Sequence, residues 1–188
     1  MSYELGMPPK AGRNGDVMLQ GTEVTLEEML QCREQRAQIQ QELLAAHHCP
    51  LISFSLNIPG PVKTTPALER LFAEGVHRIE TALAGNHLEI NEQRSIHAAT
   101  GDACFLSVTG DAVRLKALMV EIEETHPLGR IFDMDVLDTN GNKLSRPTYR
   151  KCLLCDRQAQ DCARSRRHSV SELQEKIGDL LMEFGYEL

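Results

Sequence analysis

The fold is decided by residues 129–136, which read Gly-Arg-Ile-Phe-Asp-Met-Asp-Val and place two acidic residues inside an apolar run. Asp133 and Asp135 are two positions apart, and on a β-strand this spacing directs both side chains to one face of the sheet. Two adjacent carboxylates repel each other, so a fold that keeps them usually supplies a cation. Such oxygen ligands suit Mg²⁺ or Mn²⁺, which often also bind substrate phosphates. The stretch therefore predicts a strand that serves phosphoryl or nucleotidyl transfer, with capping of a strand end as the alternative.

The segments around this strand predict a small sheet covered by helices. From residue 51 onward the order is strand, helix, strand, strand, helix, strand. We expect strands near 51–58, 87–98 (in two short pieces), 104–108 and 131–136, and helices over 65–84 and 112–124. This order is the split βαβ pattern of an α+β sandwich (βαββαβ), with helices on one face of an antiparallel or mixed sheet.

A long helix is expected before this unit. Thr25 and Glu28 form a capping box, and the helix that they open runs to about residue 46. The face of this helix that carries Leu26 is expected to point inward, and Arg33 and Arg36 lie on or close to it. Arginines in such a position often face a ligand pocket. The alternative is that they extend past the edge of the core into solvent.

The two ends of the chain are expected to differ in order. Residues 1–20, rich in Gly and Pro, are predicted to be flexible, and residues 21–188 are predicted to form a single domain. Within that domain, residues 151–188 are expected to form a helical appendage that contains cysteines. Ser169 and Glu172 form a second capping box, which opens its last helix.

Composition places the protein among ordinary globular chains of 188 residues. No apolar run approaches the roughly 20 residues needed to span a bilayer, and the first twenty residues lack the apolar segment of a secretory signal. We therefore expect a cytoplasmic protein without membrane contact. In that reducing compartment the six cysteines are expected to be thiols or metal ligands rather than disulfides.

Charge is unevenly distributed along the chain. The net charge of −7 argues against a general nucleic-acid binder. Residues 146–168 contain seven Lys or Arg and two Asp, so this basic segment carries a net charge of +5. Such a segment suits a polyphosphate ligand or an acidic protein partner, and a solvated helix surface is the alternative.

Two further places carry residues suited to phosphate chemistry. Residues 59–61 form a rigid Pro-Gly-Pro turn that is followed by Lys63 and the start of a helix, an arrangement that can cradle an anion. The spacing is not that of a P-loop, and a plain β–α connection is the alternative. His126 precedes the aspartate strand and is a candidate general base, unless it only complements the end of a helix.

The C-terminal region carries a metal-binding pattern. Cys152 and Cys155 form a Cys-x-x-Cys pair, and Cys162 and His168 follow it. Three cysteines and a histidine at this spacing are typical of a structural zinc site. The alternative is that the cysteines are small apolar side chains in the core of the appendage.

Taken together, these blocks resemble one family. They are residues 33–37 (REQRA), 59–63 (PGPVK), 126–136 (HPLGRIFDMDV), 144–146 (LSR) and 152–155 (CLLC), with the later Cys162 and His168. The chain resembles the apo-citrate lyase phosphoribosyl-dephospho-CoA transferases, also called citrate lyase holo-acyl-carrier-protein synthases. The resemblance covers nearly all of the chain after residue 22.

The resemblance implies a defined reaction. The donor is 2′-(5″-triphosphoribosyl)-3′-dephospho-CoA, the acceptor is a serine of the acyl-carrier (γ) subunit of citrate lyase, and diphosphate is released. Asp133 and Asp135 are then expected to bind Mg²⁺ or Mn²⁺, and one of them or His126 to take the serine proton. The candidate contacts to the triphosphate are Lys63, Arg130 and Arg146, followed by Arg33 and Arg36.

Two other functions remain open. The chain could be a zinc-stabilised protein-interaction module without catalysis, in which the aspartates are structural. It could also be a nucleotidyltransferase that acts on a small metabolite. The Gly-Ser element that usually precedes Asp-x-Asp in such enzymes is absent.

Overall fold

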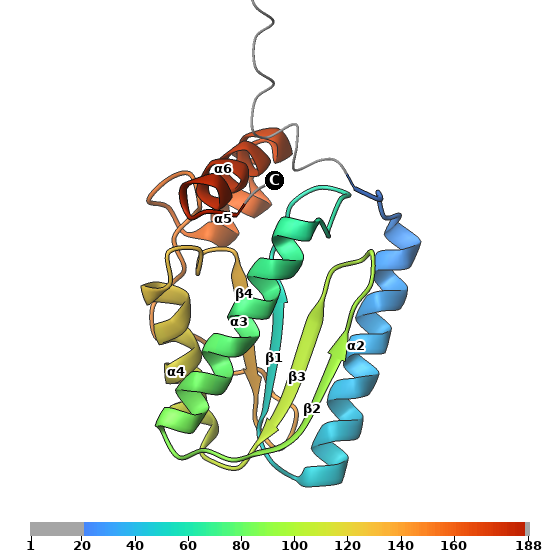
Figure 1. The fold of residues 1–188 in the computed structure, drawn as a ribbon, viewed down its shortest axis with the longest axis vertical. Helices are drawn as coiled ribbons and strands as arrows, with labels where there is room; N and C mark the ends of the chain where they lie inside the picture. The colour runs from blue at the N-terminus through green and yellow to red at the C-terminus, as the bar shows by residue number, and fades with distance from the viewer. Residues whose placement is uncertain (1–20, 187–188) are drawn as a thin grey trace, which may run out of the picture.

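Four strands form one antiparallel sheet in the order β2-β3-β1-β4 (Figure 1). The computed structural model describes residues 21–186, so the predicted flexible segment at 1–20 lies outside the described residues. The elements are α2 (Leu26–His47), β1 (Leu51–Leu56), α3 (Pro66–Gly85), β2 (Ile90–Ile96), β3 (Ala103–Val108), α4 (Ala112–Thr125), β4 (Phe132–Leu137), α5 (Ala159–Arg164) and α6 (Val170–Glu183). The predicted α+β class and the order of elements are confirmed, and the sheet is antiparallel throughout.

Each of the two helical connections joins strands that are not neighbours in the sheet. The connection from β1 to β2 through α3 skips β3, and the connection from β3 to β4 through α4 skips β1. The expected pair of short strands over 87–98 is instead the single strand β2. β4 lies at one edge of the sheet, where β1 is its neighbouring strand, and it carries the aspartates.

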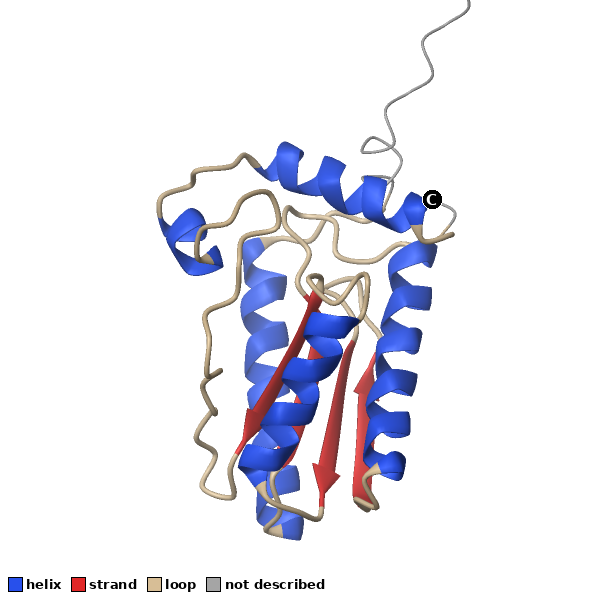
Figure 2. Cartoon of the chain, turned by 90° about the vertical axis from the view of Figure 1, so that its left-hand side faces the viewer, coloured by secondary structure: helices blue, strands red, loops and turns tan. Residues whose placement is uncertain are grey.

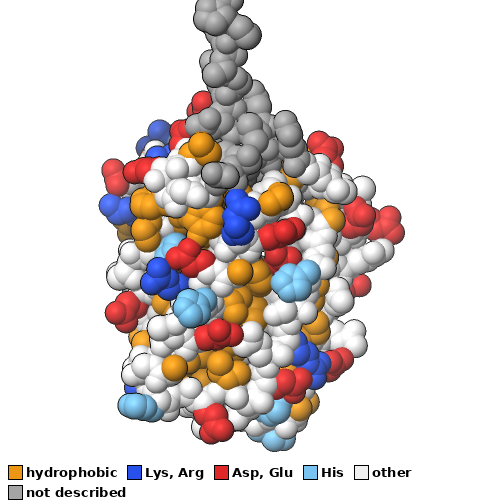
Figure 3. Space-filling view, in the orientation of Figure 1, with side chains coloured by type: hydrophobic (Ala, Val, Ile, Leu, Met, Phe, Trp, Pro, Cys, Tyr) orange, Lys and Arg blue, Asp and Glu red, His pale blue; other side chains and the backbone are white. Residues whose placement is uncertain are grey.

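The main core lies between the sheet and helices α3 and α4. The Phe54 ring of β1 stacks on that of Phe72 of α3, with ring centroids 5.1 Å apart, and meets Phe132 of β4 edge-on at 5.4 Å. Gly75 of α3 allows this approach, because a Cβ there would lie 2.3 Å from the Phe54 ring. On the surface of this side apolar side chains are visible between α2 and α3 (Figure 3), where Phe72 and Val76 line a cavity of about 780 Å³.

Helix α2 covers the opposite face of the sheet. Leu43 packs there on Leu51 of β1 and Phe105 of β3 in a second, smaller cluster. The prediction that the Leu26 face of α2 points inward is wrong at the start of this helix, because Leu26 is 76% exposed. α2 contacts β3 and β1, so the β4 side of this face remains available for a site.

The C-terminal region lies across one end of the sheet, as Figures 1 and 2 show for α6. Ile177 and Leu181 of α6 join the main core, and the Gln174 amide donates to the carbonyl oxygen of Pro59 at 3.1 Å. Gly60 adopts a φ of +87°, and a Cβ there would lie 2.4 Å from the Gln174 amide nitrogen. The Pro-Gly-Pro turn is therefore fixed by α6.

Residues 138–158 form loops, and helical structure in the appendage begins only at Ala159. The chain reverses after β4 in a turn at Asn140-Gly141: Gly141 has a φ of +81°, and Lys143 forms a β-bridge back to Leu137. Across residues 21–186, no helix has both the length and the apolar character needed to cross a bilayer.

Candidate active site

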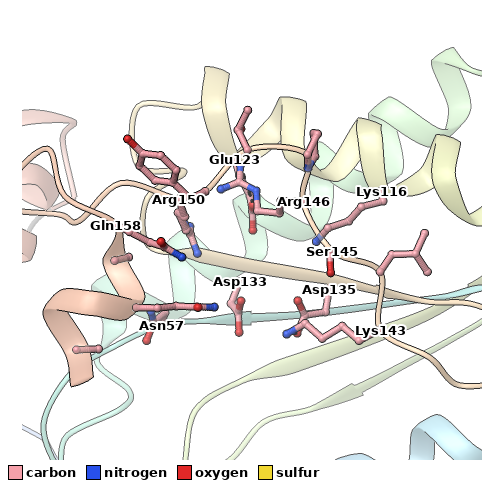
Figure 4. A pocket seen from close by; sticks show the side chains of 17 residues that line it. Asn57, Lys116, Glu123, Asp133, Asp135, Lys143, Ser145, Arg146, Arg150 and Gln158 are labelled. Carbon is pink, nitrogen blue, oxygen red and sulfur yellow. Dashed lines mark ion pairs between the residues drawn. The ribbon is translucent and has the colours of Figure 1, made fainter. Parts of the chain in front are cut away.

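The two aspartates lie side by side on the α2 face of the sheet. Asp133 is paired with Ser55 and Asp135 with Ser53 of β1, so small hydroxyl side chains lie next to the carboxylates. Both aspartates are half-buried and line a cavity of about 700 Å³. Figure 4 shows the two carboxylates next to each other, with the labelled polar side chains around them. The structure therefore places them as the Asp-x-Asp spacing predicted.

The charges in this cavity are closely balanced. Burial raises the pKa of Asp133, and the negative charge of Asp135 raises it further, although Lys143 and Arg150 act in the opposite direction. Lys143, which follows the Gly141 turn, forms an ion pair with Asp135. Its side chain is 62% exposed. The aspartate pair is thus a concentrated negative site that already attracts a cation.

Charged side chains fix the outer edge of β4. The backbone N–H of Met134, between the aspartates, donates to the Glu123 carboxylate at 2.9 Å, and Lys116 donates to the Met134 carbonyl oxygen at 2.9 Å. Arg150 donates to the carbonyl oxygens of Gly129 and Phe132. Burial lowers the pKa of Lys116 and raises that of Glu123. These contacts hold the strand that presents the aspartates.

Sequence reasoning missed most of these supporting residues. Lys116 and Glu123 are buried charged residues of α4 and lie seven positions apart, which places them on the same helix face. Ionised side chains are rarely buried unless they are paired, so two of them on the apolar side of a helix were a usable signal. No comparable pattern in the sequence indicated that the site includes Arg150, Lys143 and Asn57.

The structure places Arg146, a predicted contact to the triphosphate, in the cavity of the aspartates. It forms ion pairs with Glu123 at 3.6 Å and Glu124 at 3.0 Å. Its Nε is buried and has no hydrogen-bond partner among the described residues. A buried donor without a partner costs free energy, and an anionic ligand in the cavity could accept its hydrogen bond.

Three other predicted cations line a second cavity of about 240 Å³, which Asp133 also lines. They are Arg33, Arg36 and Lys63. Arg36 donates to the carbonyl oxygen of Gly101 at 3.1 Å, while its buried Nε has no hydrogen-bond partner in the described part of the chain. Burial and the nearby Arg33 charge lower the pKa of Lys63, which donates to the Ile58 carbonyl oxygen at 2.6 Å.

Arg130 lines a third cavity, of about 510 Å³, beside the cysteines. Burial and the neighbouring Arg150 charge lower its pKa. Asn57, which follows β1, lines all three cavities, and its N–H donates to the carbonyl oxygen of Ile131 at 2.8 Å. The three cavities therefore meet at Asn57, and Asp133 lines the first two of them.

The structure does not bring His126 to the aspartates. Its ring contacts Phe132, with centroids 4.7 Å apart, on the α3 and α4 side of the sheet. Because neighbouring residues of a strand point to opposite faces, Asp133 points away from it. The His126 ring is held by Glu74 at 3.0 Å and by the N–H of Leu128 at 3.1 Å. These contacts indicate a structural role for His126.

The predicted Cys₃His group is brought together as a candidate metal centre. The ligand atoms of Cys152, Cys155, Cys162 and His168 all lie within 4.8 Å of one another. This cluster lies beside the third cavity, which Cys152, Cys162 and His168 also line. Four ligand atoms at such separations can bind a metal ion.

The glycine of the His-Pro-Leu-Gly-Arg block, Gly129, is required for steric reasons. A Cβ on Gly129 would lie 2.3 Å from the carbonyl oxygen of Glu123. Only a residue without a side chain allows the chain to pass so close to the end of α4 before it enters β4. This close approach sets the position at which the aspartate strand begins.

A carboxylate pair on an edge strand, next to a cluster of arginine and lysine side chains, is typical of enzymes that transfer phosphorus-containing groups. A comparison with known families agrees: residues 24–184 match the model of the apo-citrate lyase phosphoribosyl-dephospho-CoA transferases. The chain belongs to this family of transferases, which confirms the resemblance seen in the sequence.

Individual relatives give the same result. Apo-citrate lyase phosphoribosyl-dephospho-CoA transferases from Escherichia coli O6:K15:H31 (strain 536) and from Shigella boydii serotype 18 are each 37% identical to this chain over 162 residues. Each alignment covers 84% of this chain and 88% of the relative. A protein of Escherichia coli strain 55989, described as a probable member, matches equally well.

Proposed function

We propose that this transferase moves the phosphoribosyl-dephospho-CoA group from 2′-(5″-triphosphoribosyl)-3′-dephospho-CoA to a serine of the acyl-carrier (γ) subunit of citrate lyase. The names of the relatives supply the transferred group and the citrate lyase acceptor. The observation that carries the proposal for the site is the half-buried aspartate pair in a cavity shared with arginine and lysine side chains.

The chemistry is a displacement at phosphorus. The serine oxygen forms a bond to the phosphorus nearest the ribose, and the bond from that phosphorus to the diphosphate oxygen breaks. Diphosphate leaves with the electron pair, and a carboxylate of the site accepts the serine proton. Negative charge grows on the diphosphate, and Arg146, Arg36 and Lys63 would neutralise it. The two arginines would do so through their buried Nε donors, which have no partner among the described residues.

The donor set fits a magnesium ion. Asp133 and Asp135 offer carboxylate oxygens on one face, and Asn57 lines the same cavity. When bound there, the ion supplies charge neutralisation at the phosphates and alignment of the reacting groups. Lys143 must then release Asp135, and its exposed position on a loop allows this movement.

The basic segment, residues 146–168, is the proposed docking surface for the carrier subunit. Arg157, Arg164, Arg166 and Arg167 are exposed, and residues 146–150 of the same segment line the cavity of the aspartates. Attraction to an acidic carrier would speed its approach. The double variant Arg164→Glu/Arg167→Glu should slow labelling mainly at low carrier concentration. Arg114→Glu, at the far end of the sheet beside Asn86, is the matched control and should not.

The test is intact-mass spectrometry of apo carrier subunit after incubation with the protein, the donor and Mg²⁺. The expected result is a mass gain equal to phosphoribosyl-dephospho-CoA, abolished by EDTA. No gain with a competent carrier would contradict the proposal and favour the interaction module. Turnover of a small phosphorylated metabolite in place of the carrier would favour the general nucleotidyltransferase.

A further inference from the structure

The Cys₃His cluster (Cys152, Cys155, Cys162 and His168) has the geometry of a closed metal site. The Cys155 and Cys162 sulfurs are 3.5 Å apart, and His168 Nε2 is 3.4 Å from the Cys155 sulfur. A tetrahedral zinc ion with bonds of about 2.3 Å to sulfur and about 2.0 Å to nitrogen requires separations of roughly 3.8 Å and 3.5 Å. These two separations are close to those around such an ion, and all four ligand atoms lie within 4.8 Å of one another.

The backbone around the first pair is folded for ligation. The Cys152 N–H donates to the carbonyl oxygen of Arg157 at 2.7 Å, and Lys151 forms a β-bridge with Gln158. The N–H groups of Leu154 and Cys155 hydrogen-bond with the Cys152 sulfur. A tight loop that directs its N–H groups at a ligand sulfur supplies outer contacts of the kind that orient metal ligands.

We propose that these four residues bind one structural Zn²⁺, which holds residues 150–168 in place as the wall between the active-site cavity and the C-terminal helices. Four protein ligands leave no open position, so the ion is structural rather than catalytic. The segment contains little regular structure: its one helix, α5, has six residues. Small units of this kind commonly depend on metal binding for their fold.

The ion would act on the active site through position. Arg150, two residues before Cys152, holds the start of β4 through the carbonyl oxygens of Gly129 and Arg130, at 2.8 Å and 3.0 Å. The N–H of Ala159 donates to the Arg150 carbonyl oxygen at 2.8 Å, and Gln158 lines the cavity of the aspartates. Loss of the ion should loosen Arg150 and Gln158 and leave the sheet folded.

The first experiment is elemental analysis of the full-length protein, purified without chelators and dialysed after addition of zinc. The expected content is one zinc ion per chain in the wild type and none in Cys162→Ser. Cys32→Ser is the matched control, because Cys32 and Cys162 are both 6% exposed, and it should retain zinc. Replacement by Co²⁺ should give a sulfur-to-cobalt charge-transfer band and visible bands of tetrahedral cobalt.

Zinc-free wild type after this treatment would overturn the proposal, as would an equal loss of zinc in Cys32→Ser or a Cys155–Cys162 disulfide in freshly purified protein. If Cys162→Ser does not fold, hydrogen exchange of the wild type with and without chelator decides. The expected result is loss of protection confined to residues 150–168, and unchanged exchange there would contradict the proposal. Zinc content is read without turnover, so its outcome is independent of the proposed transferase reaction.

Discussion

The Glu123 carboxylate of α4 accepts a hydrogen bond from the backbone N–H of Met134 at 2.9 Å, on the strand residue that separates the two aspartates. Lys116 satisfies the carbonyl oxygen of the same residue. Both side chains also line the cavity of the aspartates, but their hydrogen bonds go to the strand backbone. Both residues fix the backbone between the two aspartates, so under the proposed function they act as positioning residues.

Removal of the Glu123 carboxylate should loosen this strand. Glu123→Ala leaves the Met134 N–H without its acceptor and Arg146 without one ion pair, and an unsatisfied buried group costs about 1–3 kcal/mol. For a chain of this size we expect a Tm lower by about 2–4 °C per kcal/mol, together with slower carrier labelling. Glu123→Gln keeps an acceptor and should recover most of both losses. A Gln variant as impaired as the Ala variant would contradict this positioning role.

The negative charge of Asp133 should be required for activity and should lower the stability of the folded state. Its pKa is raised by burial and by Asp135, so the ionised form is penalised in the folded state at pH 7. This penalty disappears when the pH falls below the ordinary pKa of the group, where both states are protonated. Asp133→Asn should therefore abolish labelling while its Tm at pH 7 equals or exceeds that of the wild type.

The measurement is thermal unfolding from pH 7 to pH 3, alongside intact-mass labelling. The Tm advantage of Asp133→Asn should shrink toward acid pH. Asp111→Asn is the control, because Asp111 caps α4 far from the site and asparagine also caps helices. Retained labelling in Asp133→Asn would refute the role of the carboxylate pair.

Glu74 should stabilise the protein in a defined pH range. Hydrogen bonds from Tyr186 and His126 lower its pKa to about 2, so its contribution is full above pH 4.5 and is lost as the pH falls through about 2. Glu74→Gln should lower the Tm by a few degrees near pH 7, and the difference should close between those two pH values. Glu175→Gln, an exposed site on α6, is the control. A difference that persists unchanged at pH 2 would contradict the assignment.

Gly129→Ala should destabilise the protein through space alone. The added Cβ would meet the Glu123 carbonyl oxygen at 2.3 Å, and overpacking of this kind costs about 1–3 kcal/mol. Gly85→Ala is the control, because a Cβ there meets no atom within 4 Å. Denaturant unfolding should show a lower midpoint for Gly129→Ala only, and an unchanged midpoint would mean that the backbone shifts freely.

Local patterns in the sequence predicted much of this fold. The two capping boxes are present, with Glu28 and Thr25 bonded reciprocally at 2.7 and 3.2 Å and Glu172 and Ser169 at 2.8 and 3.1 Å. The order of strands and helices followed from periodicity and turn residues. The aspartate spacing also predicted a shared face, because the two-residue repeat of a strand is a local property.

Other features depend on long-range packing, which no local pattern records. The apolar side chains of α2 do not gather on one face, so the sequence pattern was no reliable sign of which face is buried. Leu26 was expected to point inward but is exposed, whereas Cys32 is buried. His126 is close to Asp133 in sequence, yet the sheet separates them, because the side chain of Phe132 points to the His126 side. The functional roles of the aspartates and the cations remain predictions until variants are measured.

The side chains that hold β4 also close one edge of the sheet. An edge strand offers free N–H and C=O groups to any other chain and is a common starting point for aggregation. Here Glu123, Lys116 and Arg150 occupy those groups on Met134 and Phe132. The same three residues thus hold the aspartate strand and protect its edge against intermolecular β-pairing, so variants that misplace the aspartates should also reduce solubility.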